Sequence, residues 1–260
     1  MQVPARPGPG GLADPVRRLP WVALPQHLNP FVLPVEPRQA ERHGRIDLYL
    51  PDATQPRPAV VFVHGGPIPV DLRPTPRDWP VYRGYGSAAA ARGVVGVTVD
   101  HRLHDPAGYP AAAADVAAAV DSTRADPRVD ADRLAIWFFS GGGLLLADWL
   151  RTPPDWLRCV AATYPLLAPL PGTIIDPRFQ PAEAIAAAGA LPVILTRVGR
   201  ERPQVAATVE GFIAAAHACG ARLEIIDVPD GQHGFDLLDH TDQSRRAVEQ
   251  ALDTVLATVT

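Results

Sequence analysis

The sequence predicts an α/β fold in which a mostly parallel sheet of about seven to eight strands is covered by helices on both faces. Short apolar runs without polar breaks occur at residues 59–63, 94–99 and 134–139, and such runs are typical of strands buried inside a parallel sheet. Segments with helical spacing separate them, as parallel crossovers require. The 260 residues suit one large domain with a sizeable core.

The composition excludes several classes of protein. Hydrophobic residues make up 47% and charged residues 20%, which is typical of a globular chain and not of a disordered one. All 24 basic residues are arginines, but they are scattered and the formal net charge is −4, so we expect no nucleic-acid partner. No apolar run reaches the length of about 18 residues that would indicate a membrane span. Cys159 and Cys219 have no metal-binding spacing, and we expect no metal.

Residues 1–43 form a proline-rich segment, which we predict to be an extended arm because proline blocks helices and central strands. Its second half carries apolar residues that should pack on the domain or line its cleft. These are Trp21, Val22, Leu24, Phe31, Val32 and Leu33. The chain starts with prolines and glycines where a secretory signal would have its apolar core, so we predict a cytoplasmic protein.

Residues 44–260 form the predicted folded domain. Strands are expected at residues 45–50, 59–63, 94–99, 134–139, 159–164, 192–197 and 223–228. Helices are expected at residues 79–92, 110–124, 144–150, 205–219 and 244–259. The first strand alternates apolar and polar residues as an edge strand would. Gly220 ends the predicted helix at residues 205–219. In such a sheet, functional residues lie after the carboxyl ends of the strands.

Ser140 stands between a predicted buried strand and a helix, and three glycines follow it. A serine at such a sharp corner projects its hydroxyl above the sheet edge, where a base can reach it. This arrangement is a nucleophile elbow, normally written Gly-x-Ser-x-Gly, but Phe138 replaces its first glycine. A phenyl ring there must find a pocket or push the corner open. The alternative is that Ser140 only caps a helix.

The turn after the strand 59–63 reads His64-Gly65-Gly66-Pro67. Glycines let the backbone aim its N–H groups at a substrate carbonyl, and the N–H of Gly141 would be the second donor of an oxyanion hole. Pro67 has no N–H, so Gly66 is the preferred donor of this turn and Gly65 the second choice. A plain β-turn is the alternative.

Two further strand ends carry a carboxylate and an imidazole. Glu201 follows the strand 192–197, and a carboxylate there could accept the Nδ1–H of a catalytic histidine. His233 lies in a glycine-flanked turn after the strand 223–228, where a base must stand to reach Ser140. The alternative for Glu201 is a solvated glutamate between two arginines.

We expect three more side chains to contact the substrate: His64 in the glycine turn, Phe139 beside the serine, and His101 after the strand 94–99. For His101 an ordinary hydrogen-bonded loop histidine is the alternative. The other three serines of the chain lie in or beside predicted helices, at Ser87, Ser122 and Ser244.

Together these motifs resemble the α/β-hydrolase family from about Arg45 to the C-terminus, most closely its dienelactone-hydrolase and small bacterial esterase branches. The motifs are HGGP at 64–67, DHRL at 100–103, FFSGGG at 138–143, GRERP at 199–203 and GQHGFD at 231–236. The resemblance implies a triad of serine, acid and histidine, and no cofactor. Phe138 and the glutamate at position 201, where many members have aspartate, depart from the family pattern.

The resulting hypothesis is a serine hydrolase that cleaves a carboxylic ester or lactone of a small acyl substrate through an acyl-enzyme on Ser140. Residues 166–191 leave room only for a minimal lid, so a fairly open cleft roofed by this segment, the arm and the loop 67–80 is expected. Two alternatives remain open at this point. One is an aminopeptidase or amidase of the same fold, and the other is a catalytically silent binding protein, which the phenylalanine at position 138 motivates.

Overall fold

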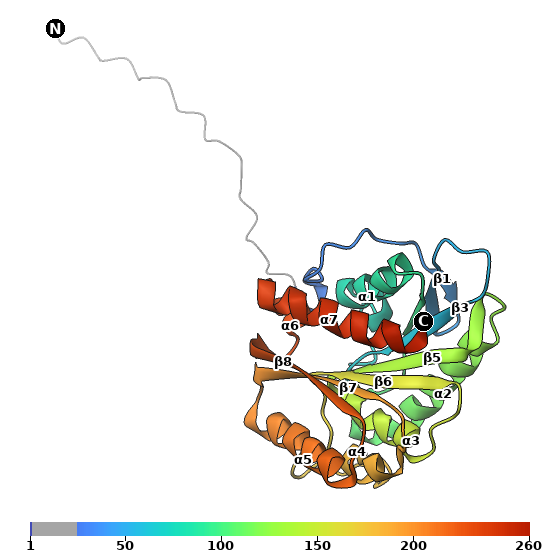
Figure 1. The fold of residues 1–260 in the computed structure, drawn as a ribbon. Helices are drawn as coiled ribbons and strands as arrows, with labels where there is room; N and C mark the ends of the chain where they lie inside the picture. The colour runs from blue at the N-terminus through green and yellow to red at the C-terminus, as the bar shows by residue number, and fades with distance from the viewer. Residues whose placement is uncertain (2–24) are drawn as a thin grey trace.

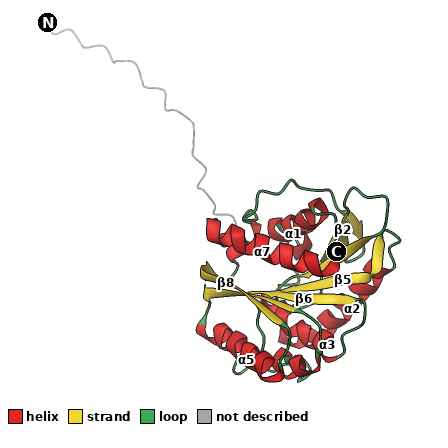
Figure 2. Ribbon diagram, viewed as in Figure 1, coloured by secondary structure: helices red, strands yellow, loops and turns green. Residues whose placement is uncertain are grey.

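The computed structural model describes residue 1 and residues 25–260, and residues 25–260 form a three-layered α/β domain (Figures 1 and 2). Its central sheet has eight strands. They are β1 (Glu41–His43), β2 (Ile46–Tyr49), β3 (Arg57–Val63), β4 (Val95–Val99), β5 (Val129–Phe139), β6 (Leu157–Thr163), β7 (Val193–Arg200) and β8 (Leu223–Gln232). The spatial order is β1-β2-β4-β3-β5-β6-β7-β8. The pairs β1–β2 and β2–β4 are antiparallel, and all other neighbouring pairs are parallel.

Helices cover both faces of the sheet, as Figure 1 shows. On one side lie α1 (Pro80–Ala91) and α7 (Asp242–Val259), and on the other α2 (Tyr109–Arg124), α3 (Leu146–Arg151), α4 (Pro181–Ala184) and α5 (Pro203–Cys219). The short α6 (Phe235–Leu238) precedes α7, and five 3₁₀ turns complete the described part of the chain. They are Gln26–Leu28, Pro76–Asp78, Pro106–Gly108, Ser140–Leu145 and Ile185–Ala187.

Each central strand contributes alternate residues to two separate cores. Val61 and Val63 of β3 pack with α2, α3 and α5, whereas Val60 and Phe62 pack with α1 and α7. Because neighbouring side chains of a strand point to opposite faces, a strand covered on both faces is apolar throughout. This is why the apolar runs of the sequence located the central strands.

The beginning of the domain differs from the prediction in two ways. The strand at residues 45–50 was expected at the edge, but β2 pairs with β4 on one side and with β1 on the other. Residues 41–43, which the sequence analysis assigned to the arm, form that outer strand. Its three residues are exposed, whereas every residue of β2 is buried.

Part of the arm lies on the helical layer and not over the cleft. Phe31, Val32 and Leu33 are buried against the core beside α1, and the Phe31 ring lies 4.7 Å from that of Tyr85. The cleft-lining role expected for the arm is therefore wrong for these three residues. Trp21, Val22 and Leu24 lie outside the described residues.

Helix α1 approaches β4 closely because two glycines face each other. A Cβ atom built on Gly96 of β4 would lie 2.5 Å from the Gly86 carbonyl oxygen and 2.7 Å from the Gly86 Cα of α1. Backbone cannot move aside as a flexible side chain can, so the packing of helix on sheet requires glycine at position 96.

We predict that Gly96→Ala lowers the free energy of unfolding by about 1–3 kcal/mol, the usual range for inserting a methyl group into a packed core. Gly211→Ala is the matched control, because a Cβ at Gly211 on α5 meets nothing within 4 Å. That control should be neutral or stabilising by about 0.4–1 kcal/mol, since alanine has less backbone freedom in the unfolded chain. Urea unfolding of both variants measures the difference, and equal stabilities would contradict the argument.

Candidate active site

Ser140 directly follows β5 and has the unusual backbone angle φ of 50°, which non-glycine residues rarely adopt. It begins the 3₁₀ turn Ser140–Leu145, which continues into α3. The sequence prediction of a strand, a sharp corner and a helix is thus matched, although the first turns are 3₁₀ and not α-helical. Ser140 lines a pocket and is only partly buried, so its hydroxyl is accessible.

The glycines after Ser140 let the backbone of the 3₁₀ turn Ser140–Leu145 contact the backbone of the turn at residues 64–67. A Cβ on Gly141 would lie 1.9 Å from the Gly66 carbonyl oxygen, and one on Gly142 would lie 2.5 Å from the His64 carbonyl oxygen. Contacts this short are impossible for any residue with a side chain. The glycine run is therefore a requirement of the packing between these two turns.

Phe138 and Phe139 point to opposite faces of the sheet, and both are fully buried. Phe138 pairs with Val63 on one side and with the small Ala162 on the other, and its ring belongs to the core beneath α2 and α3. The Phe138 ring is therefore accommodated in the hydrophobic core. Phe139 packs among aromatic residues below α1 and lines none of the space around Ser140, so the predicted substrate contact of Phe139 is wrong.

The pairing of β7 with β8 brings the predicted acid and base together. Arg200 lies opposite Gln232 at the end of this pairing, so Glu201 and His233 are the next residues on two adjacent parallel strands. His233 Nδ1 lies 2.5 Å from Glu201 Oε2, and His233 Nε2 lies 2.7 Å from Ser140 Oγ. With Nδ1–H donating to the carboxylate, Nε2 is free to accept the serine proton.

The Glu201 carboxyl group is held as a carboxylate. Burial by itself would raise its pKa, but the hydrogen bond and charge of His233, the backbone N–H of Arg202 and the Arg202 guanidinium outweigh burial, and the pKa is lowered. The side chain of Glu201 is only 4% exposed, and Arg202 N donates to its Oε1 at 2.8 Å. An ionised carboxylate in this place can hold the imidazole through its Nδ1–H.

Two backbone N–H groups at the pocket, those of Gly66 and Gly141, are the candidates for an oxyanion hole. Gly141 follows the serine at the start of a 3₁₀ turn, where the first N–H groups have no carbonyl partner within the turn. Gly66 lines the pocket with it. Gly65 does not fit the role, because its N–H donates to the Tyr82 hydroxyl at 3.3 Å. Gly66 and Gly141 are thus the better pair, and Gly65 is a supporting residue.

His64 and His101 form a buried stacked pair with ring centroids 3.7 Å apart. His64 Nδ1 lies 2.5 Å from the Gly65 carbonyl oxygen, and its Nε2 accepts from the His101 N–H. His101 Nε2 lies 2.9 Å from the His64 carbonyl oxygen. Neither ring lines the pocket at Ser140, so the predicted substrate contacts of His64 and His101 are wrong. The hydrogen bonds of this pair instead connect the turn at residues 64–67 to the loop after β4.

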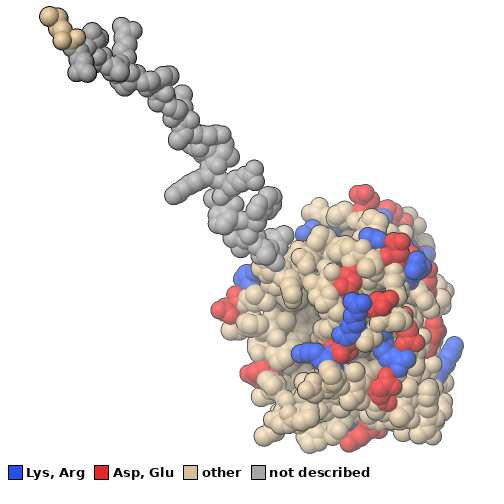
Figure 3. Space-filling model, turned by 90° about the vertical axis from the view of Figure 1, so that its left-hand side faces the viewer, with Lys and Arg blue, Asp and Glu red and all other residues tan. Residues whose placement is uncertain are grey.

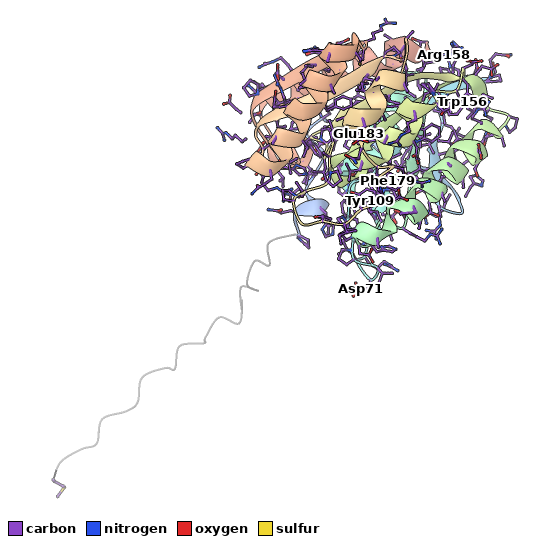
Figure 4. The ribbon with its side chains drawn as sticks, turned by 90° about the horizontal axis from the view of Figure 1, so that it is seen from below. Asp71, Tyr109, Trp156, Arg158, Phe179 and Glu183 are labelled. Atoms are coloured by element: carbon purple, nitrogen blue, oxygen red, sulfur yellow. The ribbon has the colours of Figure 1, made fainter. Side chains whose placement is uncertain are left out.

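The pocket at Ser140 has a volume of about 290 Å³ and a mainly apolar wall. The segment between β6 and β7 contributes Leu166, Leu170, Thr173 and Ile175, and no described residue of the arm takes part. Tyr109 forms another wall and donates from its hydroxyl to the Gly141 carbonyl oxygen at 2.8 Å. Figure 4 shows Tyr109 beside Phe179, whose ring centroid is 5.4 Å away.

A buried carboxylate near the base was not identified from the sequence. Asp236 is fully buried and accepts hydrogen bonds from the hydroxyls of Tyr164 and Tyr85. Its only signal was its place in the GQHGFD motif. The tyrosines come from β6 and α1, so their meeting at this carboxylate depends on the tertiary fold.

The described residues contain no cluster of three or more histidine, cysteine or acidic side chains that could hold a metal ion. Within the same part of the chain, no helix combines the length and apolarity needed to cross a membrane. Acidic and basic side chains are interspersed on the face drawn in Figure 3.

Comparisons with known proteins agree with this architecture. The sequence model of the BD-FAE family matches residues 46–148, a stretch that includes Ser140 but neither Glu201 nor His233. No functionally curated protein matches the chain. Among solved structures, DphMB1 is 22% identical with a TM-score of 0.69, and the match covers 87% of this chain and 88% of DphMB1.

Two esterases are similar over comparable lengths. Esterase 2 of Thermogutta terrifontis is 18% identical with a TM-score of 0.63, covering 86% of this chain and 94% of the esterase. Esterase Est22 is 22% identical with a TM-score of 0.65, covering 85% and 78% of the two chains. The chain has the α/β-hydrolase fold.

The buried histidine pair leads to a prediction about pH and stability. Burial, the largest cause, lowers the pKa of His101 to about 4 and that of His64 well below 6.5. Between these values and about 6.5, the unfolded chain binds more protons than the folded one, so the free energy of unfolding rises with pH by up to about 1.4 kcal/mol per pH unit and group. Above pH of about 6.5 both states are neutral and this contribution is complete.

We therefore expect His101→Gln to flatten the rise of unfolding free energy between pH of about 4 and 6.5. His217→Gln, which removes an exposed histidine of α5, is the control and should keep a slope close to that of the wild type. Urea unfolding at a series of pH values gives both slopes. The same slope in His101→Gln as in the wild type would disprove the assignment.

Proposed function

We propose that this protein is a serine hydrolase that cleaves carboxylic esters through an acyl-enzyme on Ser140. The observation that carries the proposal is the unbroken series of contacts from Ser140 Oγ to His233 and from His233 to Glu201, at the edge of an apolar pocket. Accessible serine, imidazole and buried carboxylate in this order can activate a hydroxyl at neutral pH.

In this mechanism His233 Nε2 takes the proton of Ser140 as its Oγ attacks the acyl carbon. The Glu201 carboxylate stabilises the imidazolium that forms. The N–H groups of Gly66 and Gly141 donate to the oxyanion of the tetrahedral intermediate, and the imidazolium then protonates the departing alcohol. Water, activated by the same imidazole, attacks the acyl-enzyme and releases the acid.

The known relatives support ester hydrolysis over other reactions. Both Thermogutta terrifontis esterase 2 and Est22 are esterases. The former has been solved phosphorylated by paraoxon, and the latter with p-nitrophenol. We transfer to this chain the reaction class alone, because the identities are 18% and 22%.

The pocket favours a small, largely uncharged acyl group. Its volume of about 290 Å³ lies near the lower limit for ligand pockets, and leucine, isoleucine, valine and proline side chains form much of its wall. A short linear ester and a small lactone would both fit this description, so lactones belong to the substrates to be tried.

The two alternative functions have less support. An aminopeptidase would need acidic side chains to hold the substrate amine. Among the described residues, the pocket lining includes no aspartate or glutamate, and Arg202 in it would repel an ammonium group. A silent binding protein was considered because of Phe138, whose ring is accommodated in the core away from the pocket. We therefore place ester hydrolysis first.

The first test is the loss of the nucleophile. Ser140→Ala should lower kcat for p-nitrophenyl acetate by about a thousandfold or more, because the attacking oxygen is gone while the pocket remains. Ser122→Ala, on the exposed surface of α2, should leave turnover unchanged. A fluorophosphonate probe should label the wild type and the Ser122 variant alone. Full turnover by the Ser140 variant would end the proposal.

A second test measures which acyl chain lengths the pocket accepts. Across p-nitrophenyl esters of increasing chain length, kcat/KM should peak at short acyl groups and fall when the chain outgrows the cavity. Leu170→Ala removes part of the wall formed by the segment between β6 and β7, so it should move the optimum toward longer chains. An unchanged profile in that variant would show that the acyl group binds elsewhere.

A further inference from the structure

Asp236 is a second carboxylate near His233, but unlike Glu201 it forms no hydrogen bond with the imidazole. It is fully buried and follows His233 by three positions, at the start of α6. The Tyr164 hydroxyl donates to its two oxygens at 2.8 and 3.0 Å, and the Tyr85 hydroxyl donates to Oδ2 at 3.0 Å. Two hydroxyl donors on one buried carboxylate are a specific arrangement, because an unpaired buried charge is costly.

Tyr164 connects this carboxylate to the base. It directly follows β6 with a φ of 37°, an uncommon angle for a bulky residue. Its ring centroid lies 4.9 Å from that of His233, at an interplanar angle of 54°, and it also forms an edge-on contact with Phe235. The hydroxyl bound to Asp236 therefore fixes where the aromatic ring stands beside the imidazole.

Residues of the N-terminal segment contact both Asp236 and Tyr85. Val32 N donates to the Asp236 carbonyl oxygen at 2.9 Å, and the Phe31 ring lies 4.7 Å from that of Tyr85. Arg245 of α7 in turn donates to the Val32 carbonyl oxygen at 3.3 Å. Two buried residues of the arm, Phe31 and Val32, thus contact the Tyr85 ring and the backbone of Asp236.

Electrostatics link Asp236 to the reaction cycle. Burial, the largest cause, raises the pKa of Asp236 to about 6 against the lowering effect of its hydrogen bonds and of His233, so the group is ionised at neutral pH. The other groups around His233 are Ser140 and Glu201, with which it hydrogen-bonds, the neutral Tyr164, and Arg202 beyond Glu201. Asp236 thus adds a negative charge near the imidazole without a direct hydrogen bond to it.

We propose that Tyr164 and Asp236 are positioning residues for the base, with the Tyr164 ring holding the imidazole of His233 in line between Ser140 and Glu201 and Asp236 fixing that ring. The mechanistic part rests on the proposed serine hydrolase function. Neither residue forms a hydrogen bond with Ser140, and the contact that links them to the triad is the packing of the Tyr164 ring beside His233.

Steady-state kinetics of three variants test this assignment. Tyr164→Phe keeps the ring but loses the anchoring hydroxyl, and kcat for p-nitrophenyl acetate should fall about tenfold with little change in KM. Asp236→Asn should cause at least as large a loss and move the acid limb of the kcat/KM profile to lower pH, because a neighbouring negative charge no longer stabilises the imidazolium. Tyr85→Phe is the matched control: it removes a hydroxyl from the same carboxylate but has no ring contact with His233, and kcat should stay within about twofold of the wild type.

Equal losses in Tyr164→Phe and Tyr85→Phe would overturn the proposal, because they would show that the carboxylate only stabilises the fold. Wild-type kcat and pH profile in both Tyr164→Phe and Asp236→Asn would overturn it as well. Thermal unfolding of each variant checks that it is folded, and Tyr164→Phe, which preserves the packing volume, keeps the test valid if Asp236→Asn does not fold.

A second readout does not need activity. The proton between His233 Nδ1 and Glu201 should give a downfield NMR signal, which His233→Asn would assign by its loss. We expect this signal to weaken in Tyr164→Phe and to persist in Tyr85→Phe. If the wild type hydrolyses no ester and Ser140 is unlabelled, the proposed function fails while this comparison still tests the positioning role. An unaltered signal in Tyr164→Phe would refute that role whatever the activity.

Discussion

The arrangement of the site depends on the parallel pairing of β7 with β8, which continues past the core to place Arg200 opposite Gln232. Residues that follow paired positions on neighbouring parallel strands emerge from the same edge of a sheet, close to one strand spacing apart. Glu201 and His233 are these residues. The carboxylate and the imidazole are thereby held within hydrogen-bond distance by the sheet itself, and not by the conformations of long loops.

Ser140 reaches the same edge at the end of β5, two strands from β7 and three from β8, and the imidazole of His233 connects its hydroxyl to the Glu201 carboxylate. The imidazole is rigid and has nitrogens on opposite sides, so one hydrogen bond to Glu201 decides where the other nitrogen points. Residues behind the imidazole then determine its inclination. In this protein they are aromatic, and the carboxylate that orders them is supplied by the same turn that carries the base.

The sequence was sufficient to predict seven of the eight strands, the helices α1, α2, α3, α5 and α7, and the positions of Ser140, Glu201 and His233, because each of these three residues follows a predicted strand. It was not sufficient for the direction of single side chains. Phe139 stands beside the serine yet points into the core, since alternation along a strand outweighs proximity in sequence. The tyrosines of Asp236 are 72 and 151 positions away, and no local pattern reports such a contact.

The structure also explains why the elbow tolerates phenylalanine at its first position. The two backbone segments approach closely only after the serine, where Gly141 and Gly142 contact the backbone of the turn at residues 64–67. Before the serine, position 138 faces side chains, and its neighbour Ala162 is small. A requirement for glycine exists where backbone meets backbone, whereas a large ring can be accommodated where the opposing residue is small. The Gly-x-Ser-x-Gly pattern therefore combines two separate constraints, one before the serine and one after it. This chain keeps glycine after the serine, where the backbone meets the turn at residues 64–67, and has a core side chain at position 138.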